Sequence, residues 1–100
     1  MGRCEIRLLR LAEEDLIDIV TYIAAERPSA AEALASRVEK DLRLLADNPY
    51  LGRIPDDEEL TRLGYRYLVI GDFLAFYTVE GNTVIVHRII RGTRDYLNLF

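Results

Sequence analysis

The sequence predicts one α+β domain with an N-terminal strand, a helical hairpin and then a three-stranded antiparallel meander. Two observations carry this prediction. The chain has 100 residues, half of them apolar, which is the size of one ordinary globular domain spanning residues 1–100. Its hydrophobic period also changes in order along the chain, from two residues to about 3.6 and back to two. Two helices followed by antiparallel strands are expected to pack as a hairpin on one face of the sheet.

The first two elements follow from this change of period. Residues 4–8 alternate apolar with charged side chains, as a short half-buried strand does, and the predicted strand continues into Leu9. From Ala12 onward the apolar residues fall at i, i+3, i+4 and i+7, the spacing of an amphipathic helix. These residues are Leu16, Ile19, Val20 and Ile23.

A second helix is expected after Pro28, because the residue before a proline avoids helical backbone. Ser29 and Glu32 have the spacing of a capping box, which would make Ser29 the N-cap. The pair Asn48-Pro49 should end the helix. Its apolar stripe consists of Leu34, Val38, Leu42 and Leu45.

The connection that follows is rich in turn residues and holds four consecutive acids at 56–59. We expect a solvated loop or one helical turn there. Carboxylates bind hard cations, but four adjacent acids lack the alternating, glycine-turned spacing of a calcium loop. With one histidine, His87, and one cysteine, Cys4, the sequence offers no other metal-ligand cluster, so no metal or cofactor is expected.

Three segments rich in aromatic and β-branched residues complete the sheet, at 65–70, 73–79 and 83–90. Gly71-Asp72 and residues 80–82 separate them and suit tight hairpin turns. The meander carries more aromatic side chains than two helices can cover, namely Tyr65, Tyr67, Phe73, Phe76 and Tyr77. We therefore expect a partner on the remaining apolar surface.

The charge balance narrows the classes of partner. Thirteen Lys and Arg against seventeen Asp and Glu give a net charge of −4, which repels polyanions, so direct DNA binding is not expected. No stretch has the length and apolar character of a signal peptide or a membrane span. A single cysteine suits a reducing compartment, and we expect a cytoplasmic protein without membrane contact.

Five short patterns, in order along nearly the whole chain, resemble one protein family. Residues 12–23 carry an alanine, an Asp-Leu pair, an isoleucine and a tyrosine as that family's first helix does. Residues 48–53 resemble its "Pro, two residues, Gly-Arg" break, and residues 65–69 and 73–79 resemble its arginine-bearing and aromatic strands. Residues 88–95 are similar to its closing motif, Arg-Val-Leu-His-Gly-Arg-Arg-Asp. The chain thus resembles the ParE/RelE superfamily, the toxins of bacterial type II toxin–antitoxin modules.

That resemblance implies a partner and a choice of activities. A cognate antitoxin, ParD-like or similar, would fold on the toxin and form a hetero-oligomer. ParE-like members inhibit DNA gyrase by binding, whereas RelE-like members cleave messenger RNA on the ribosome. A third possibility is a degenerate member of the family, which binds its antitoxin but has no toxic activity.

Two departures from the pattern of RNA-cleaving members favour gyrase inhibition as the activity. Leu74 stands where many RNA-cleaving members carry an arginine, and Arg91 stands where the closing motif has histidine. Cleavage by attack of a 2′-hydroxyl needs an acid, a base and cations around the phosphate, and arginine stays protonated. The acidic composition also opposes docking on the ribosome. We therefore expect no catalytic residues.

The resemblance also selects candidate site residues. Target contact is expected from Arg88, Arg91, Arg94, Asp95 and Tyr96. A nuclease would instead use Arg66, Arg88, Arg91, Arg94 and Tyr96. Antitoxin contact is expected at Leu16, Ile19, Tyr22, Leu34, Val38, Tyr67, Phe73 and Tyr77. The alternative for the arginines is surface pairing with Asp72, Glu80 and Asp95, and His87 is expected to be structural.

Overall fold

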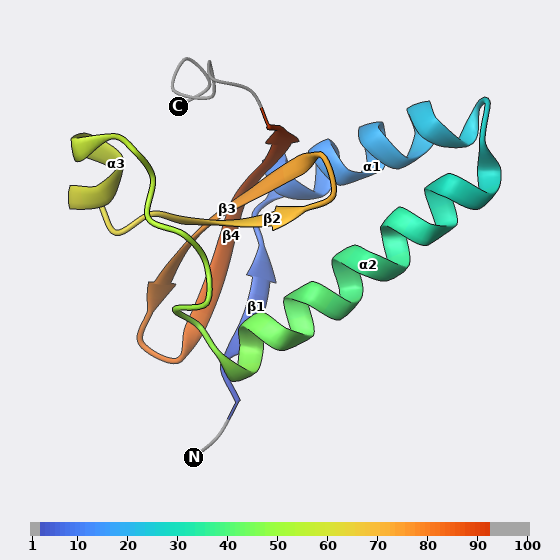
Figure 1. Cartoon of the computed structure of the whole chain (residues 1–100). Coiled ribbons are helices and arrows are strands. Elements are labelled where there is room, and N and C mark those ends of the chain that lie inside the picture. The colour runs from blue at the N-terminus through green and yellow to red at the C-terminus, as the bar shows by residue number, and fades with distance from the viewer. Residues whose placement is uncertain (1–2, 93–100) are drawn as a thin grey trace.

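A computed structural model describes residues 3–92 of the chain. The predicted α+β fold is confirmed, with its helices and strands in the predicted order (Figure 1). The elements are β1 (Glu5–Leu8), α1 (Arg10–Ala24), α2 (Pro28–Asp47), α3 (Glu58–Arg62), β2 (Arg66–Ile70), β3 (Phe73–Glu80) and β4 (Thr83–Arg91). None of the helices in this part of the chain is long and apolar enough to span a membrane.

The four strands form one mixed sheet in the order β1-β4-β3-β2. The three C-terminal strands make the expected antiparallel meander, and β1 pairs in parallel with β4 at the edge. Parallel pairing requires a long crossover, which the helical hairpin between β1 and the meander provides. At both hairpin turns a glycine with positive φ stands first, Gly71 at 61° and Gly81 at 60°, as a type II′ turn requires.

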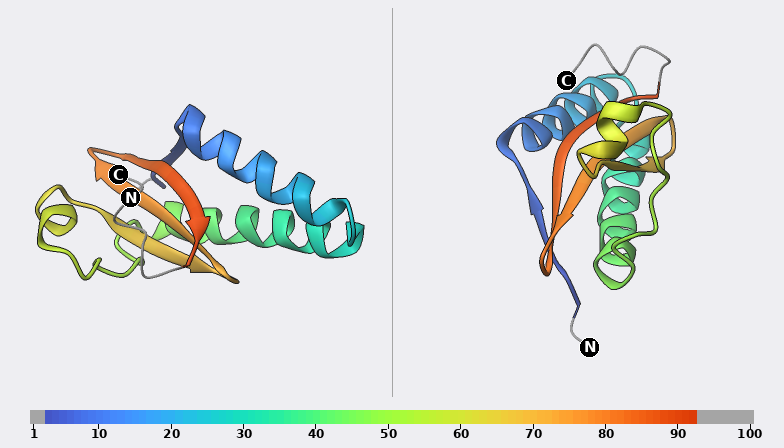
Figure 2. Two further views of the ribbon diagram at one scale, coloured as in Figure 1. Left: turned by 90° about the horizontal axis from the view of Figure 1, so that it is seen from above. Right: turned by 90° about the vertical axis from the view of Figure 1, so that its left-hand side faces the viewer.

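The hairpin of α1 and α2 covers one face of the sheet (Figures 1 and 2). Apolar residues of both helices and of all four strands meet there in the main core, and Ala12, Leu45, Ile70, Ala75, Tyr77, Val84 and Val86 are its most buried members. Phe76 lies between two of these residues along β3, so its side chain points to the opposite face.

On that opposite face Phe76 belongs to a second, smaller cluster with Leu60 and Ile90. Leu60 comes from α3, which lies away from the hairpin (Figure 1). The acidic run therefore leads into one helical turn, in which the carboxylate of Asp57 accepts the N–H of Leu60 at 2.8 Å. The chain itself thus covers part of the aromatic surface for which the sequence predicted a partner.

The capping box predicted at Ser29 is wrong. Helix α2 begins at Pro28, its N-cap is Arg27, and no side chain caps this end. Proline is favoured at the first helical position, because its φ is preset and its missing N–H would have no partner there anyway. Ser29 consequently lies inside the first turn.

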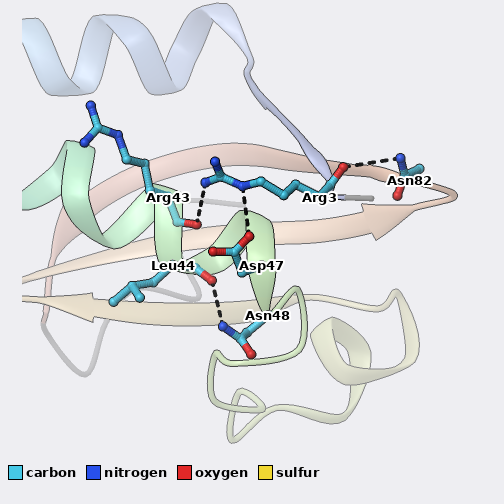
Figure 3. Close-up of polar contacts among 6 residues, drawn as sticks. All are labelled: Arg3, Arg43, Leu44, Asp47, Asn48 and Asn82. Carbon is cyan, nitrogen blue, oxygen red and sulfur yellow. Dashed lines mark hydrogen bonds and ion pairs between the residues drawn. The ribbon is translucent and has the colours of Figure 1, made fainter. Parts of the chain in front are cut away.

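Polar contacts fasten the C-terminal end of α2 to the chain before β1 (Figure 3). The guanidinium of Arg3 pairs with Asp47 at 2.8 Å, and the N–H of Cys4 donates to the carbonyl of Ala46 at 2.9 Å. The side-chain amide of Asn48 donates to the carbonyl of Leu44 at 3.2 Å. The ion pair is exposed and adds little stability, so the backbone contact and the core fix this junction.

Candidate functional site

Arg66 and Arg91, two of the arginines expected at a functional site, do not lie side by side. The register places Arg66 opposite Tyr77 and Arg91 opposite Phe73 on the intervening strand β3. Four residues along a strand separate two positions by about 13 Å, so these arginines lie toward opposite ends of the sheet. Arg94, Asp95 and Tyr96 lie outside the described residues.

Arg88 makes a forked ion pair with Asp15 of α1. Its Nε lies 2.7 Å from Oδ2 and its Nη2 lies 2.9 Å from Oδ1. The two side chains are only 23% and 17% exposed. Hydrogen bonding to Asp15 raises the pKa of Arg88 above its ordinary value, against the lowering effect of burial. The sequence analysis predicted pairing of the C-terminal arginines with other acids. It did not identify Asp15, which lies 73 residues from Arg88 in the sequence.

Arg66 holds the connection before α3. One of its Nη atoms donates to the carbonyls of Tyr50 at 3.3 Å and Gly52 at 3.1 Å, and the guanidinium lies 5.2 Å from the centre of the Tyr50 ring. Nearby, Arg53 and Tyr67 exchange two backbone hydrogen bonds, at 2.8 and 2.9 Å. These contacts bind the connection to the outer edge of β2.

Arg91 differs from Arg66 and Arg88, because its guanidinium makes no hydrogen bond or ion pair within residues 3–92. It is exposed at the end of β4 and lies 5.9 Å from the centre of the Phe73 ring. A shallow cavity of about 430 Å³ opens beside it, between the β2–β3 turn and Gly92. The next residue is held in place, since the N–H of Gly92 donates to the carbonyl of Asp72 at 2.8 Å.

His87 is engaged at both ring nitrogens. Nε2 lies 2.9 Å from the hydroxyl of Thr78, and Nδ1 lies 3.3 Å from the hydroxyl of Tyr65. The Tyr65 and His87 rings meet edge to face, with centroids 4.8 Å apart. Burial lowers the pKa of His87, and the charge of Glu80 opposes this shift. A neutral imidazole between two hydroxyls supports the structural role expected for this residue.

The residues predicted to contact an antitoxin fall into three classes. Tyr22 projects from α1 and is 82% exposed. Val38 and Tyr77 lie in the core and offer no surface in this conformation. The others are partly buried, namely Leu16, Ile19, Leu34, Tyr67 and Phe73.

A groove that was not predicted from the sequence lies beside the outer edge of β2. It has a volume of about 280 Å³, and the exposed side chains of Leu44, Leu51 and Val69 contribute to its lining. These residues come from α2, the following connection and β2, so no linear pattern brings them together. Among the described residues, no group of three or more His, Cys, Asp or Glu side chains could hold a metal ion.

The ParE toxin family of the type II toxin–antitoxin system parDE matches residues 6–96 of the chain. The chain belongs to this family. No curated protein sequence matches it significantly.

Solved structures show that this ParE-family chain shares its fold with two toxin–antitoxin proteins. One comes from the chromosomal ParDE TA system of P. aeruginosa, with a TM-score of 0.74, 22% identity, and coverage of 91% of this chain and 98% of the other. The second comes from the toxin–antitoxin complex RelBE2 of Mycobacterium tuberculosis. Its TM-score is 0.60 and its identity 18%, and the match covers 92% of this chain and 94% of the other. At these identities the likeness establishes the fold.

Proposed function

We propose that this ParE-family chain is a toxin that inhibits DNA gyrase by binding it and is neutralised by a cognate antitoxin. The observation that favours gyrase over RNA as the target is that Arg66 and Arg88 are both bound within the fold. RNA cleavage needs cations that surround the phosphate as charge develops. Arg66 is bound to two backbone carbonyls and Arg88 to the carboxylate of Asp15. Two of the five side chains assigned to a nuclease are thus already used within the fold.

Arg91 is the described residue best placed to contact the target. It is exposed and makes no polar contact within residues 3–92, its guanidinium lies over the Phe73 ring, and its side chain lines an open cavity. Arginine in such a setting can form a forked pair with a carboxylate of a protein partner. We assign it the central described position of the target surface, with Arg94, Asp95 and Tyr96 following along the chain.

The antitoxin is proposed to cover the helical hairpin and the groove beside β2. Tyr22 supplies an exposed aromatic side chain, and Leu44, Leu51 and Val69 supply apolar surface. An antitoxin segment that folds on binding would bury these side chains, which suits a chain that is disordered when free. The complex is expected to be a hetero-oligomer.

Supercoiling by purified gyrase tests the proposal. The wild-type chain should inhibit supercoiling, and the antitoxin should restore it. Arg91→Ala should weaken inhibition, whereas Arg7→Ala, which removes an exposed arginine from β1, should not. Unimpaired gyrase at a large excess of folded toxin would overturn the proposal.

Induction in a bacterial host separates gyrase from the ribosome as target. Growth arrest with intact transcripts and a DNA-damage response supports gyrase inhibition. Arrest with codon-phased cuts in messenger RNA would instead identify a RelE-like nuclease. Soluble expression without arrest would indicate a module that only binds its antitoxin.

A further inference from the structure

Within residues 3–92, the end of β4 has no neighbouring strand on the side of β1. The parallel pairing of β1 with β4 stops at Leu8 opposite Val86, and the N–H of Leu9 makes the last bond, to the carbonyl of Val86 at 3.0 Å. Strand β4 continues for five more residues, to Arg91, and among the described strands it pairs there with β3 only. Its outer backbone groups along this stretch therefore need another partner.

A bulge determines which backbone group faces outward. Tyr77 lies opposite Val86 and Phe76 opposite Arg88, so His87 is an extra residue on β4. One extra residue shifts the alternation of the strand by one position. The next backbone N–H on the β1 side is consequently that of Ile89.

The carboxylate of Asp15 takes the place of the missing strand. Its Oδ2 accepts the N–H of Ile89 at 3.0 Å and the Nε of Arg88 at 2.7 Å, and its Oδ1 accepts the Nη2 of Arg88 at 2.9 Å. Three charge-assisted hydrogen bonds therefore join one side chain of α1 to two consecutive residues of β4. Both side chains are mostly shielded from solvent, so water competes weakly for these bonds.

We propose that Asp15 is a positioning residue that fixes the end of β4 and thereby sets the direction in which Arg91 is presented to the target. Arg91 follows Arg88 by three residues, about 10 Å along a strand. Beyond the N–H of Ile89, the described part of the strand pairs with β3, so the Asp15 contact is the last hydrogen bond that joins it to the helical layer within residues 3–92. The inference rests on the proposed function, because it concerns the residue assigned to target contact.

The position of Arg91 can be measured without any target. The guanidinium lies over the Phe73 ring, so the ring current should shift the NMR signals of the Arg91 side-chain protons in the folded chain. Asp15→Asn keeps one oxygen acceptor but removes the charge, and it should reduce this ring-current shift. Asp18→Asn removes the same charge from an exposed position one turn along α1 and should leave the shift unchanged.

Thermal unfolding must show that each variant is folded at the temperature of the spectra. If Asp15→Asn is unfolded there, Arg88→Lys replaces it, since lysine keeps the charge but loses the fork that matches the carboxylate. A folded variant of the pair with an unchanged Arg91 shift would overturn the inference.

A double-mutant cycle tests the functional consequence. Asp15→Asn should raise the concentration needed for half-inhibition of gyrase by about tenfold, the effect of one hydrogen bond to a charged group. In an Arg91→Ala background the same change should have almost no further effect, because Asp15 acts through Arg91. Fully additive losses would show that Asp15 does not act through Arg91 and would overturn the inference. If the wild type itself leaves gyrase unimpaired, the proposed function fails while the spectra still decide the role of Asp15.

Discussion

The hydroxyl of Tyr77 accepts a hydrogen bond from the backbone N–H of Gly52, with the two atoms 2.8 Å apart inside the protein. The Tyr77 ring is fully buried on β3, and Gly52 lies in the connection between α2 and α3. A buried tyrosine needs a partner for its polar end, and a buried N–H needs an acceptor. One contact meets both needs and fastens the connection to the core. Burial also raises the pKa of Tyr77, which keeps its hydroxyl protonated.

Gly52→Ala should destabilise the fold by about 2–3 kcal/mol through overpacking. A Cβ atom there would lie 2.6 Å from the Tyr77 hydroxyl oxygen and 2.9 Å from the carbonyl oxygen of Tyr67, both in fixed surroundings. Urea unfolding followed by circular dichroism measures the change. Gly64→Ala is the comparison, because a Cβ there meets open space and costs only the strain of a φ of 87°. Equal losses for the two variants would contradict the packing argument.

Tyr77→Phe should cost about 1–3 kcal/mol, because it keeps the buried ring but leaves the N–H of Gly52 without its acceptor. The dependence of the unfolding free energy on urea should keep its slope, since the surface exposed on unfolding hardly changes. Tyr50→Phe is the matched control: this tyrosine is exposed, and phenylalanine keeps the ring that faces Arg66. Similar midpoints for wild type and Tyr77→Phe would show that water satisfies Gly52.

Local patterns were sufficient to predict most of the fold. Each predicted element followed from a pattern among near neighbours in sequence: the alternation in residues 4–8, the helical spacing after Ala12 and the β-branched runs of the meander. Two local signals competed at the start of α2, where Pro28 prevailed over the capping preference of Ser29. The parallel pairing of β1 with β4 joins residues almost eighty positions apart, and no periodicity encodes it.

The site was less predictable for the same reason. The pairing of Asp15 with Arg88 and that of Gly52 with Tyr77 depend on how distant elements are superposed. The sequence identified Arg88 and Arg91 as candidate site residues. It did not show that Arg88 pairs with Asp15 inside the fold while Arg91 is exposed. Burial likewise separates Tyr77 from Tyr22, although both are aromatic residues in family motifs.

The stability of the protein should depend on pH through His87. Burial holds the pKa of this side chain below its ordinary 6.5, so the unfolded chain binds more protons than the folded chain between the two pKa values. The free energy of unfolding should therefore fall as the pH decreases through 6.5 and level off below the folded pKa. The contribution is fully present above pH 6.5, where the ring is neutral in both states.

His87→Gln isolates this effect, because glutamine can still bond to the hydroxyl of Thr78 but does not titrate. Unfolding free energies of wild type and variant, measured between about pH 5 and pH 8, should converge as the pH falls. The difference between the two proteins isolates the contribution of residue 87. Curves that stay parallel over this range would mean that His87 keeps its ordinary pKa in the folded protein.

Tyr22→Ala should separate antitoxin binding from folding. The side chain is 82% exposed, so its loss should change the free energy of unfolding by less than about 0.5 kcal/mol. Buried against an antitoxin, an aromatic anchor of this kind contributes about 2 kcal/mol or more, so the dissociation constant should rise at least about thirtyfold. Calorimetric titration of the toxin with its antitoxin measures this change. Thr21→Ala alters the adjacent exposed residue of α1 and should bind as the wild type does. Undiminished affinity of Tyr22→Ala would move the antitoxin surface away from this end of the hairpin, toward the groove lined by Leu44 and Val69.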